Sequence, residues 1–203
     1  MPEHPEQRRS PRHAGAHKFD PARAHLLDSP ERARFLPEAP IIALLQLSGD
    51  ETVLDYGAGT GRFAIKLVEE LPQGRVIAID ESAEMVELLE ARTAGRANIE
   101  TVAITDNDVP LPDACADRIL AVNLLHEVRG ERALVEMRRL LAEQGLLIVV
   151  DWDRDRASEP GPPSEHRYSA AEAQQELISA GFETELLSTT LPYHFTLRAQ
   201  RSG

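Results

Sequence analysis

Short apolar runs and segments with a helical repeat alternate along most of the chain. The runs at 52–54, 75–80, 99–104, 118–122 and 145–150 predict buried strands. Between them, apolar residues recur every three or four positions, as on a helix with one buried face. Strands that alternate with helices predict a mostly parallel sheet covered by helices on both faces.

Capping residues mark where several of the helices begin and end. Ser82 is placed to cap the helix after the second strand, and Ser169-Ala170-Ala171-Glu172 is a capping box that predicts a last helix closing at Gly181. Residues 182–189 and 193–199 predict a terminal antiparallel hairpin with Pro192 in its turn. Another helix is expected to lead through Gly145 into the fifth strand; its apolar face holds Leu134, Met137, Leu140 and Leu141.

The N-terminal part differs from the rest in composition. Residues 1–18 hold almost nothing apolar and are expected to be a disordered tail, in which the scattered histidines are not expected to form a metal site. Ser29-Pro30-Glu31 starts a short helix that Pro37 stops, and a second helix is expected to end in a left-handed cap at Gly49. We therefore expect a tail at 1–18, an N-terminal helical cap at 19–49 and an α/β domain at 50–203.

Charge and cysteine content narrow the function classes. The chain has 203 residues and a formal net charge of −12, which argues against a dedicated nucleic-acid binder and against docking on an anionic membrane. Cys115 is the single cysteine, so an internal disulfide and a cysteine metal cluster are excluded. No apolar run approaches the ~20 residues of a membrane span, and no apolar segment follows the N-terminal arginines as in a secretory signal. A cytoplasmic protein is the expectation.

The chemistry of the chain is concentrated in the loop after the first strand. Gly57, Gly59 and Gly61 alternate with other residues between that strand and a helix. Such glycines permit positive φ and let a ligand approach the backbone, while the helix start favours a negatively charged group. The alternative is a purely structural glycine turn. The acid Asp80 at the end of the second strand favours a nucleotide-type pocket, because an acid there can meet ribose hydroxyls.

The spacing of the motif distinguishes between nucleotide-type cofactors. A dinucleotide fingerprint requires a third glycine where this chain has Arg62. The pattern Asp55-x-Gly57-x-Gly59-x-Gly61 followed by Asp80, with Leu111-Pro112-Asp113 and the strands at 117–123 and 145–150, instead resembles class I S-adenosylmethionine-dependent methyltransferases. The loop and the short length resemble most the type 11 and quinone-biosynthesis methyltransferases.

The resemblance implies a Rossmann-like α/β fold with a seven-stranded, mostly parallel sheet and an antiparallel C-terminal hairpin. It implies S-adenosyl-L-methionine as cofactor and S-adenosyl-L-homocysteine as product. An acid before the Leu-Pro-Asp loop would accept the adenine amino group, and either Thr105 or Asp106 occupies that place; a carboxylate is the stronger acceptor, which favours Asp106. The implied cofactor-binding residues are Asp55, Gly57, Ala58, Gly59, Gly61, Asp80, Glu81, Asp106 and Asn123.

Residues on the acceptor side follow from the same resemblance. N-terminal helices in this family lie over the cofactor cleft, so they either contact the acceptor through His25, Asp28, Arg32 and Arg34 or expose these as solvated faces. Asp151 and Trp152, past the fifth strand, are pocket candidates, with Tyr193 and His194 behind them. The proline-rich segment 154–167 is expected to be a lid rather than a linker.

The expected reaction is in-line methyl transfer to a small-molecule acceptor. A general base is needed only if the acceptor is protonated, and His126 and His166 are the candidates. Because Asn123-Leu124-Leu125-His126 departs from the Asn/Asp-Pro-Pro-aromatic motif of base-flipping methyltransferases, nucleic acid is not expected as acceptor. The alternatives are a non-catalytic scaffold or regulatory module and a nucleotide-dependent oxidoreductase.

Overall fold

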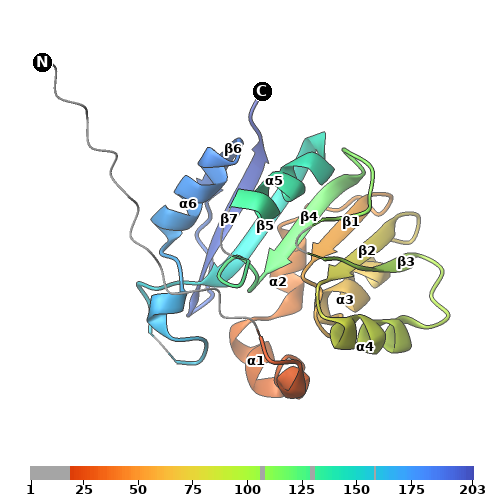
Figure 1. The fold of residues 1–203 in the computed structure, drawn as a ribbon, viewed down its shortest axis with the longest axis horizontal. Coiled ribbons are helices and arrows are strands. Elements are labelled where there is room, and N and C mark those ends of the chain that lie inside the picture. Colours follow the sequence, from red (N-terminus) through yellow and green to blue (C-terminus); the bar gives the residue numbers. More distant parts are fainter. Residues whose placement is uncertain (1–18, 106–107, 129–130, 158) are drawn as a thin grey trace, which may run out of the picture.

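The structure, a computed structural model, describes residues 19–105, 108–128, 131–157 and 159–203. Seven strands form one sheet in the order β3-β2-β1-β4-β5-β7-β6 (Figure 1). All neighbours are parallel except β7, which is antiparallel to β5 and to β6. The predicted α/β fold with an antiparallel C-terminal hairpin is confirmed. The strands are β1 Thr52–Tyr56, β2 Arg75–Asp80, β3 Ile99–Ala103, β4 Ala116–Val122, β5 Leu141–Trp152, β6 Phe182–Leu186 and β7 His194–Arg201.

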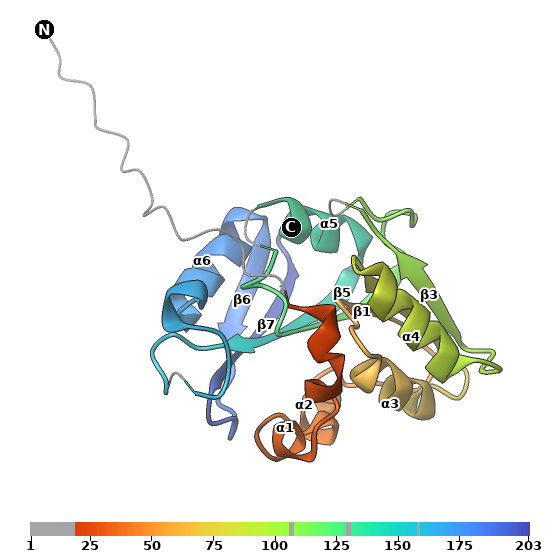
Figure 2. The same ribbon diagram turned by 60° about the horizontal axis from the view of Figure 1, so that its bottom comes forward.

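Helices cover both faces of the sheet (Figures 1 and 2). One face carries α2 Glu38–Ala43, α3 Arg62–Glu70 and α4 Ala83–Thr93, with α1 Pro30–Phe35 beside them. The other carries α5 Glu131–Leu140 and α6 Ala170–Ser179. Short 3₁₀ helices span Pro21–Leu26 and Ser164–His166. Within the described ranges, none of the helices has the length and apolar character to cross a bilayer.

Successive side chains along each strand point to opposite faces of the sheet, so the sheet has two hydrophobic cores, one on each face. In β1, Leu54 joins the core under α5 and α6, while Val53 joins the core under α2 and α3. The helix stripes expected from the sequence are buried: Ala64, Leu67 and Val68 on α3, Met85, Val86 and Leu89 on α4, and Leu134, Met137 and Leu140 on α5. The sheet therefore needs both helix layers, and it holds the β1 carboxyl end rigidly.

The predicted caps of α4 and α6 are confirmed, but two predicted boundaries are wrong. Ser82 Oγ accepts from Met85 N, and Ser169 forms the capping box with Glu172. α2 ends at Ala43, well before Gly49; that glycine (φ +107°) forms a separate turn whose N–H groups donate to the Glu51 carboxylate. β5 begins at Leu141, which pairs with Ala116; Leu141 was expected on the preceding helix, and Gly145 lies inside the strand rather than before it.

Gly61 allows α3 to start directly after the loop. It has φ +83°, and a Cβ there would overlap Leu89 Cδ1 of α4. Gly95 has nearly the same φ, +81°, but a Cβ there would meet nothing within 4 Å. A comparison of the two positions therefore separates the cost of backbone strain from the cost of a steric clash with a neighbouring side chain.

We expect Gly95→Ala to lower the free energy of unfolding by about 1 kcal/mol through positive-φ strain alone. Gly61→Ala should cost about 2–4 kcal/mol, because overpacking against Leu89 adds to the same strain. Urea unfolding without ligand measures both losses. In a Leu89→Ala background, the further loss caused by Gly61→Ala should be smaller than in the wild type. Equal losses for the two alanine variants would contradict this account.

Candidate active site

The glycine loop between β1 and α3 is held against β2 by its own backbone. The N–H groups of Gly57 and Ala58 both donate to Ile79 O at 2.9 Å. Gly57 has φ +80°, and a Cβ there would lie 2.7 Å from Leu124 Cδ1, so any larger residue would clash. The loop follows β1, beside the reversal of strand order between β2 and β4, where open α/β sheets bind ligands.

Asp80 connects the end of β2 to this loop. Its Oδ2 accepts from Gly59 N at 2.7 Å and its Oδ1 from Ser82 N at 2.9 Å. Burial raises the pKa of Asp80, while these N–H groups act against the shift. The carboxylate thus fixes the loop and still lines the cavity beside it.

A cavity of about 830 Å³ lies over the carboxyl ends of β1, β2, β4 and β5. Its floor comes from the sheet, one wall from the N-terminal segment and another from residues 160–163 of the predicted lid. Gly61 lies outside its lining and caps α3 instead. Asp106 lies outside the described residues, and Thr105 is not in the lining. The lining includes these predicted site residues: Asp55, Gly57, Ala58, Gly59, Asp80, Glu81, Asn123, His126 and Trp152.

A carboxylate oxygen and an amide oxygen are among the buried polar atoms of this lining that lack partners among the described residues. Asp55 Oδ2 and Asn123 Oδ1 are buried without a hydrogen bond. Burial raises the pKa of Asp55 to about 7, and the charge of Asp80 adds to this, while the Ala64 N–H opposes it. Asn123 itself has φ +54° directly after β4. Both oxygens are acceptors that a positively charged or N–H-bearing ligand would satisfy.

His126 and Asp151 form a buried pair beside this floor. Asp151 Oδ1 lies 2.7 Å from His126 Nδ1, and the backbone N–H groups of His126 and Trp152 also donate to this carboxylate. Asp151 is fully buried, and His126 is 4% exposed and lines the cavity. An ionised carboxylate only accepts, so Nδ1 carries the hydrogen and Nε2 is the basic nitrogen of the neutral ring.

Glu127 also lines the cavity and connects it to the N-terminal segment. Its Oε2 accepts from Phe19 N at 3.0 Å, and its Oε1 lies 3.7 Å from His126 Nε2. Burial raises the pKa of Glu127, and the neighbouring His126 opposes that shift. The sequence did not identify this residue as part of a site, because an acid after a histidine carries no motif.

Aromatic rings form the far wall. The Trp152 ring lies 5.8 Å from Phe35 and 4.2 Å from the fully buried His194. Burial lowers the pKa of His194 to about 3, Asp151 opposes the shift, and Arg32 and Arg167 add to it. His194 is therefore a neutral packing ring at physiological pH. Tyr193 packs edge-on to Phe35 and lies behind the cavity lining, as does His194.

The segment 154–167 is folded around one buried arginine. Arg167 donates to the carbonyls of Ala157, Pro160 and Pro162 at 2.8–3.2 Å, and its guanidinium lies 5.2 Å from the Trp152 ring centroid. Pro160–Pro163 consequently face the cavity. His166 lies on the 3₁₀ helix Ser164–His166, outside the cavity lining. Nothing in the local sequence indicated the role of Arg167, since its partners are backbone carbonyls.

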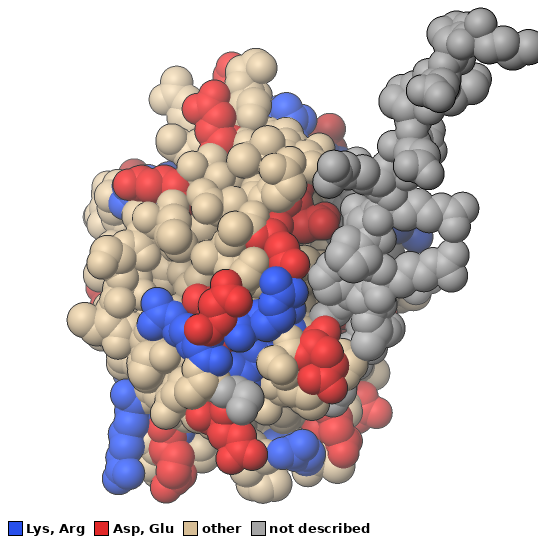
Figure 3. Space-filling model, turned by 90° about the vertical axis from the view of Figure 1, so that its left-hand side faces the viewer, with Lys and Arg blue, Asp and Glu red and all other residues tan. Residues whose placement is uncertain are grey.

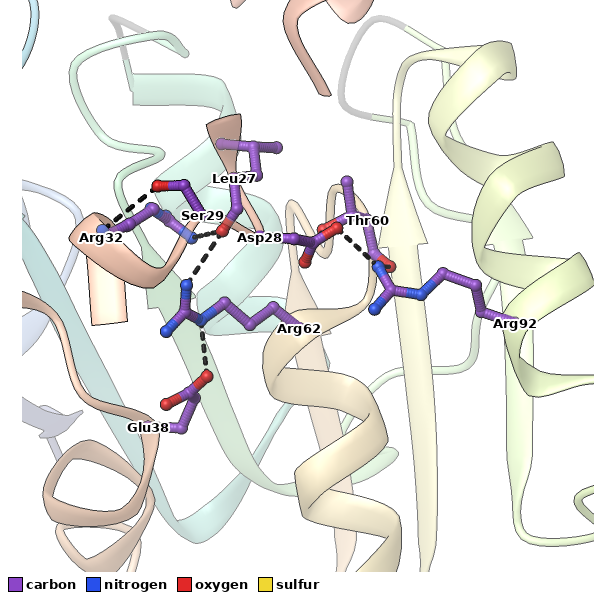
Figure 4. A network of polar contacts seen from close by, with 8 residues as sticks. All are labelled: Leu27, Asp28, Ser29, Arg32, Glu38, Thr60, Arg62 and Arg92. Atoms are coloured by element: carbon purple, nitrogen blue, oxygen red, sulfur yellow. Dashed lines mark hydrogen bonds and ion pairs between the residues drawn. The ribbon is translucent and has the colours of Figure 1, made fainter. Parts of the chain in front are cut away.

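Ion pairs and hydrogen bonds attach the N-terminal segment to the glycine loop and to the helices beside it (Figure 4). Arg92 on α4 contacts Asp28 at 2.9 Å and Thr60 O at 2.7 Å, and Thr60 Oγ1 donates to Asp28. Arg62 donates to Leu27 O and pairs with Glu38. Arg62, which replaces the third dinucleotide glycine, thus binds the segment that covers the loop.

The structure distinguishes between the four residues of this segment that were candidates for contact with the acceptor. His25 and Arg34 are exposed, and Asp28 is engaged with Arg92 and Thr60. Arg32 lines the cavity. Within the described ranges, no group of three or more metal-ligating side chains is assembled.

Comparison with known proteins agrees with this geometry. A family model described as a methyltransferase domain matches residues 53–145. The solved structure of a SAM-dependent methyltransferase from Aquifex aeolicus is 30% identical, with a TM-score of 0.83 over 90% of this chain and 98% of that chain.

Curated relatives match in the same region. An uncharacterized methyltransferase of Mycobacterium tuberculosis (strain ATCC 25618 / H37Rv) is 36% identical over 126 residues, 61% of this chain and 48% of that protein. A ubiquinone/menaquinone biosynthesis C-methyltransferase of Bordetella avium is 32% identical over 120 residues, 58% of this chain and 46% of that protein. The chain spans about half the length of the curated relatives it matches.

The chain belongs to the S-adenosylmethionine-dependent methyltransferase family. The predicted resemblance to class I methyltransferases is confirmed, and the cofactor is S-adenosyl-L-methionine, with S-adenosyl-L-homocysteine as product. The cavity fits this molecule: the glycine loop admits a close approach, and the two unpartnered oxygens of Asp55 and Asn123 are acceptors suited to its ammonium group.

The raised pKa of Asp55 predicts a pH-dependent stability. A carboxyl whose pKa is higher in the folded protein destabilises the fold as pH rises through the interval between the unfolded and folded values, here 3.8 and about 7. Between pH 5 and 8, the wild type should lose about 2 kcal/mol more free energy of unfolding than Asp55→Asn. Urea unfolding at the two pH values measures this, with the exposed-site variant Asp50→Asn as control. Parallel pH profiles for wild type and Asp55→Asn would refute it.

Proposed function

We propose that this chain transfers the methyl group of S-adenosylmethionine to a hydroxyl or amine of a small-molecule acceptor. The observation that carries the proposal is the His126–Asp151 pair. It places an oriented imidazole in the same cavity as the glycine loop and Asp80. A cofactor-binding scaffold without chemistry would have no use for such a pair. A nicotinamide oxidoreductase is disfavoured by the family to which the chain belongs.

The cofactor would be held by groups already in place. Asp80 and Glu81 would bind the ribose hydroxyls, Asp55 and Asn123 the ammonium group, and the backbone of Gly57 and Gly59 would make close contact; all six residues line the cavity, and Asp55 and Asn123 each have an unpartnered oxygen. When bound, S-adenosylmethionine would supply an activated methyl group, whose carbon the acceptor would attack in line while S-adenosylhomocysteine leaves through its sulfur. The protein's main task is then orientation, which alone is worth several orders of magnitude.

The proton of the acceptor would pass to His126. Asp151 holds Nδ1 protonated, so Nε2 takes the proton as the acceptor atom forms its bond to carbon. Asp151 then stabilises the imidazolium and does not itself touch the acceptor. Glu127, 3.7 Å from Nε2, is the next group along the cavity wall to which that proton can move.

The enclosure of the cavity favours a small acceptor. The N-terminal segment and Pro160–Pro163 cover a volume of about 830 Å³, in the range of small-molecule sites. On the side where α6 and the lid lie, basic side chains form a small group with acidic ones on and around it, rather than a broad basic surface (Figure 3). Together with the formal net charge of −12, the charges on this face disfavour nucleic acid as acceptor.

The cofactor assignment is tested by calorimetry with S-adenosylhomocysteine. Wild type should bind in the micromolar range, and Asp80→Ala should lose at least about tenfold in affinity, because a charged acceptor for ribose and loop is removed. Asp113→Ala, which removes an exposed carboxylate outside the cavity lining, is the matched control. Unchanged affinity in Asp80→Ala would remove this residue from the cofactor site.

The base assignment is tested by methyl transfer to hydroxyl- and amine-bearing metabolites, with S-adenosylhomocysteine release as readout. His126→Gln and Asp151→Asn should lower kcat about 10²- to 10⁴-fold while cofactor affinity stays within about threefold. His166→Gln, outside the cavity lining, should behave as wild type. Full activity in His126→Gln would contradict the assignment of this residue as the base.

A further inference from the structure

Arg32 is a cationic side chain in the cavity wall that the proposed mechanism does not use. Its Nη1 donates to Leu27 O at 3.1 Å. Among the residues that the structure describes, its guanidinium makes no ion pair and no second hydrogen bond. Since a guanidinium has five N–H donors, most of its capacity remains for a ligand.

The acids near Arg32 are already engaged by other groups. Asp28 contacts Arg92 and Thr60, and Glu38 pairs with Arg62. Burial lowers the pKa of Arg32 to about 10, and the neighbouring charge of Arg62 adds to this, while Asp28 and Glu38 oppose it. The side chain is therefore charged at neutral pH, partly desolvated and next to a like charge. An anion in the cavity would relieve this cost.

Arg32 shares the cavity lining with aromatic side chains. Phe35 follows it by three residues on α1, a spacing that places side chains on one helix face, and both line the cavity. The Phe35 ring lies 5.8 Å from Trp152, and the charge of Arg32 is felt at His194 behind it. A cation and two apolar rings therefore line the same cavity as the His126 base.

We propose that the acceptor is a small planar carboxylic acid, whose carboxylate pairs with Arg32 and whose flat body lies against Phe35 and Trp152. This proposal rests on the methyltransferase function proposed above. A carboxylate held by a guanidinium is a weaker nucleophile, so the methyl group goes to a hydroxyl or amine elsewhere on the molecule, facing His126. Arg32 is thus the residue that selects acidic acceptors.

Trp152 allows a direct binding test, because it is the only tryptophan in the chain and lines the cavity. Its fluorescence is followed in protein saturated with S-adenosylhomocysteine during titration with benzoate and phenylacetate and with their amides, benzamide and phenylacetamide. Wild type should bind each acid about 10- to 100-fold more tightly than its amide, as expected for a charge-assisted pair.

Three variants make the test specific. Arg32→Met should abolish the preference for acids with little change for the amides, and Arg32→Lys should keep part of it. Arg34→Met, the same change at an exposed position of the same helix, should match wild type. Arg62 still donates to Leu27 O in the Arg32 variants, so the N-terminal segment keeps its attachment, which thermal unfolding verifies. Equal binding of acids and amides by wild type, or a preference that survives Arg32→Met, would overturn the proposal.

The carboxylate of the cofactor is the other possible partner of Arg32, and a second titration separates the two. S-Adenosylhomocysteine carries that carboxylate, and 5′-methylthioadenosine lacks it. If Arg32→Met weakens only the former and leaves the acid preference unchanged, Arg32 binds the cofactor and the acceptor assignment is overturned. Failure of wild type to bind S-adenosylhomocysteine at all would instead reject the proposed function.

Discussion

The hydrogen bond from Gly59 N to the Asp80 carboxylate is the contact on which the rest of the site depends. It joins the loop after β1 to the end of β2, and the second oxygen of Asp80 holds Ser82, the cap of α4. One carboxylate thereby fixes the glycine loop and the start of the next helix. Burial raises the pKa of this acid, and three backbone N–H groups, including that of Glu81, oppose the rise because they favour the charged form.

Buried charges organise the proposed acceptor side of the cavity in a comparable way, although with different partners. Asp151 accepts from two backbone N–H groups and from His126, and Arg167 donates to three carbonyls of the proline-rich segment. In both cases most hydrogen bonds of the charged group are made with main-chain atoms. These bonds fix the backbone of a loop that has no regular secondary structure of its own. Rigid loops of this kind can hold an acceptor in one orientation, which is what a methyl transfer requires.

The cofactor half could be predicted from the sequence because its signals are local. Gly57, Gly59 and Gly61 are close in sequence and in space, and Asp80 follows at the end of the next strand. The pairing of His126 with Asp151 could not be predicted, since 25 residues separate them and only the β4–β5 register brings them together. His166 and Tyr193 were selected for chemistry and approximate position, but side-chain direction in irregular segments is set by tertiary contacts. The same holds for Gly49, whose turn is fixed by the Glu51 carboxylate.

The two halves of the cavity also differ in their place along the chain. The part of the chain that the family model matches, residues 53–145, contains the glycine loop, Asp80, Asn123 and His126. Arg32 and Phe35 precede it, and Trp152 and the lid follow it. The proposed acceptor wall thus comes from two flanking segments, while the glycine loop and Asp80 lie between them along the chain. Side chains of these segments that face the cavity can change and still leave in place the contacts by which Asp28, Arg62 and Arg92 attach the N-terminal segment to the glycine loop.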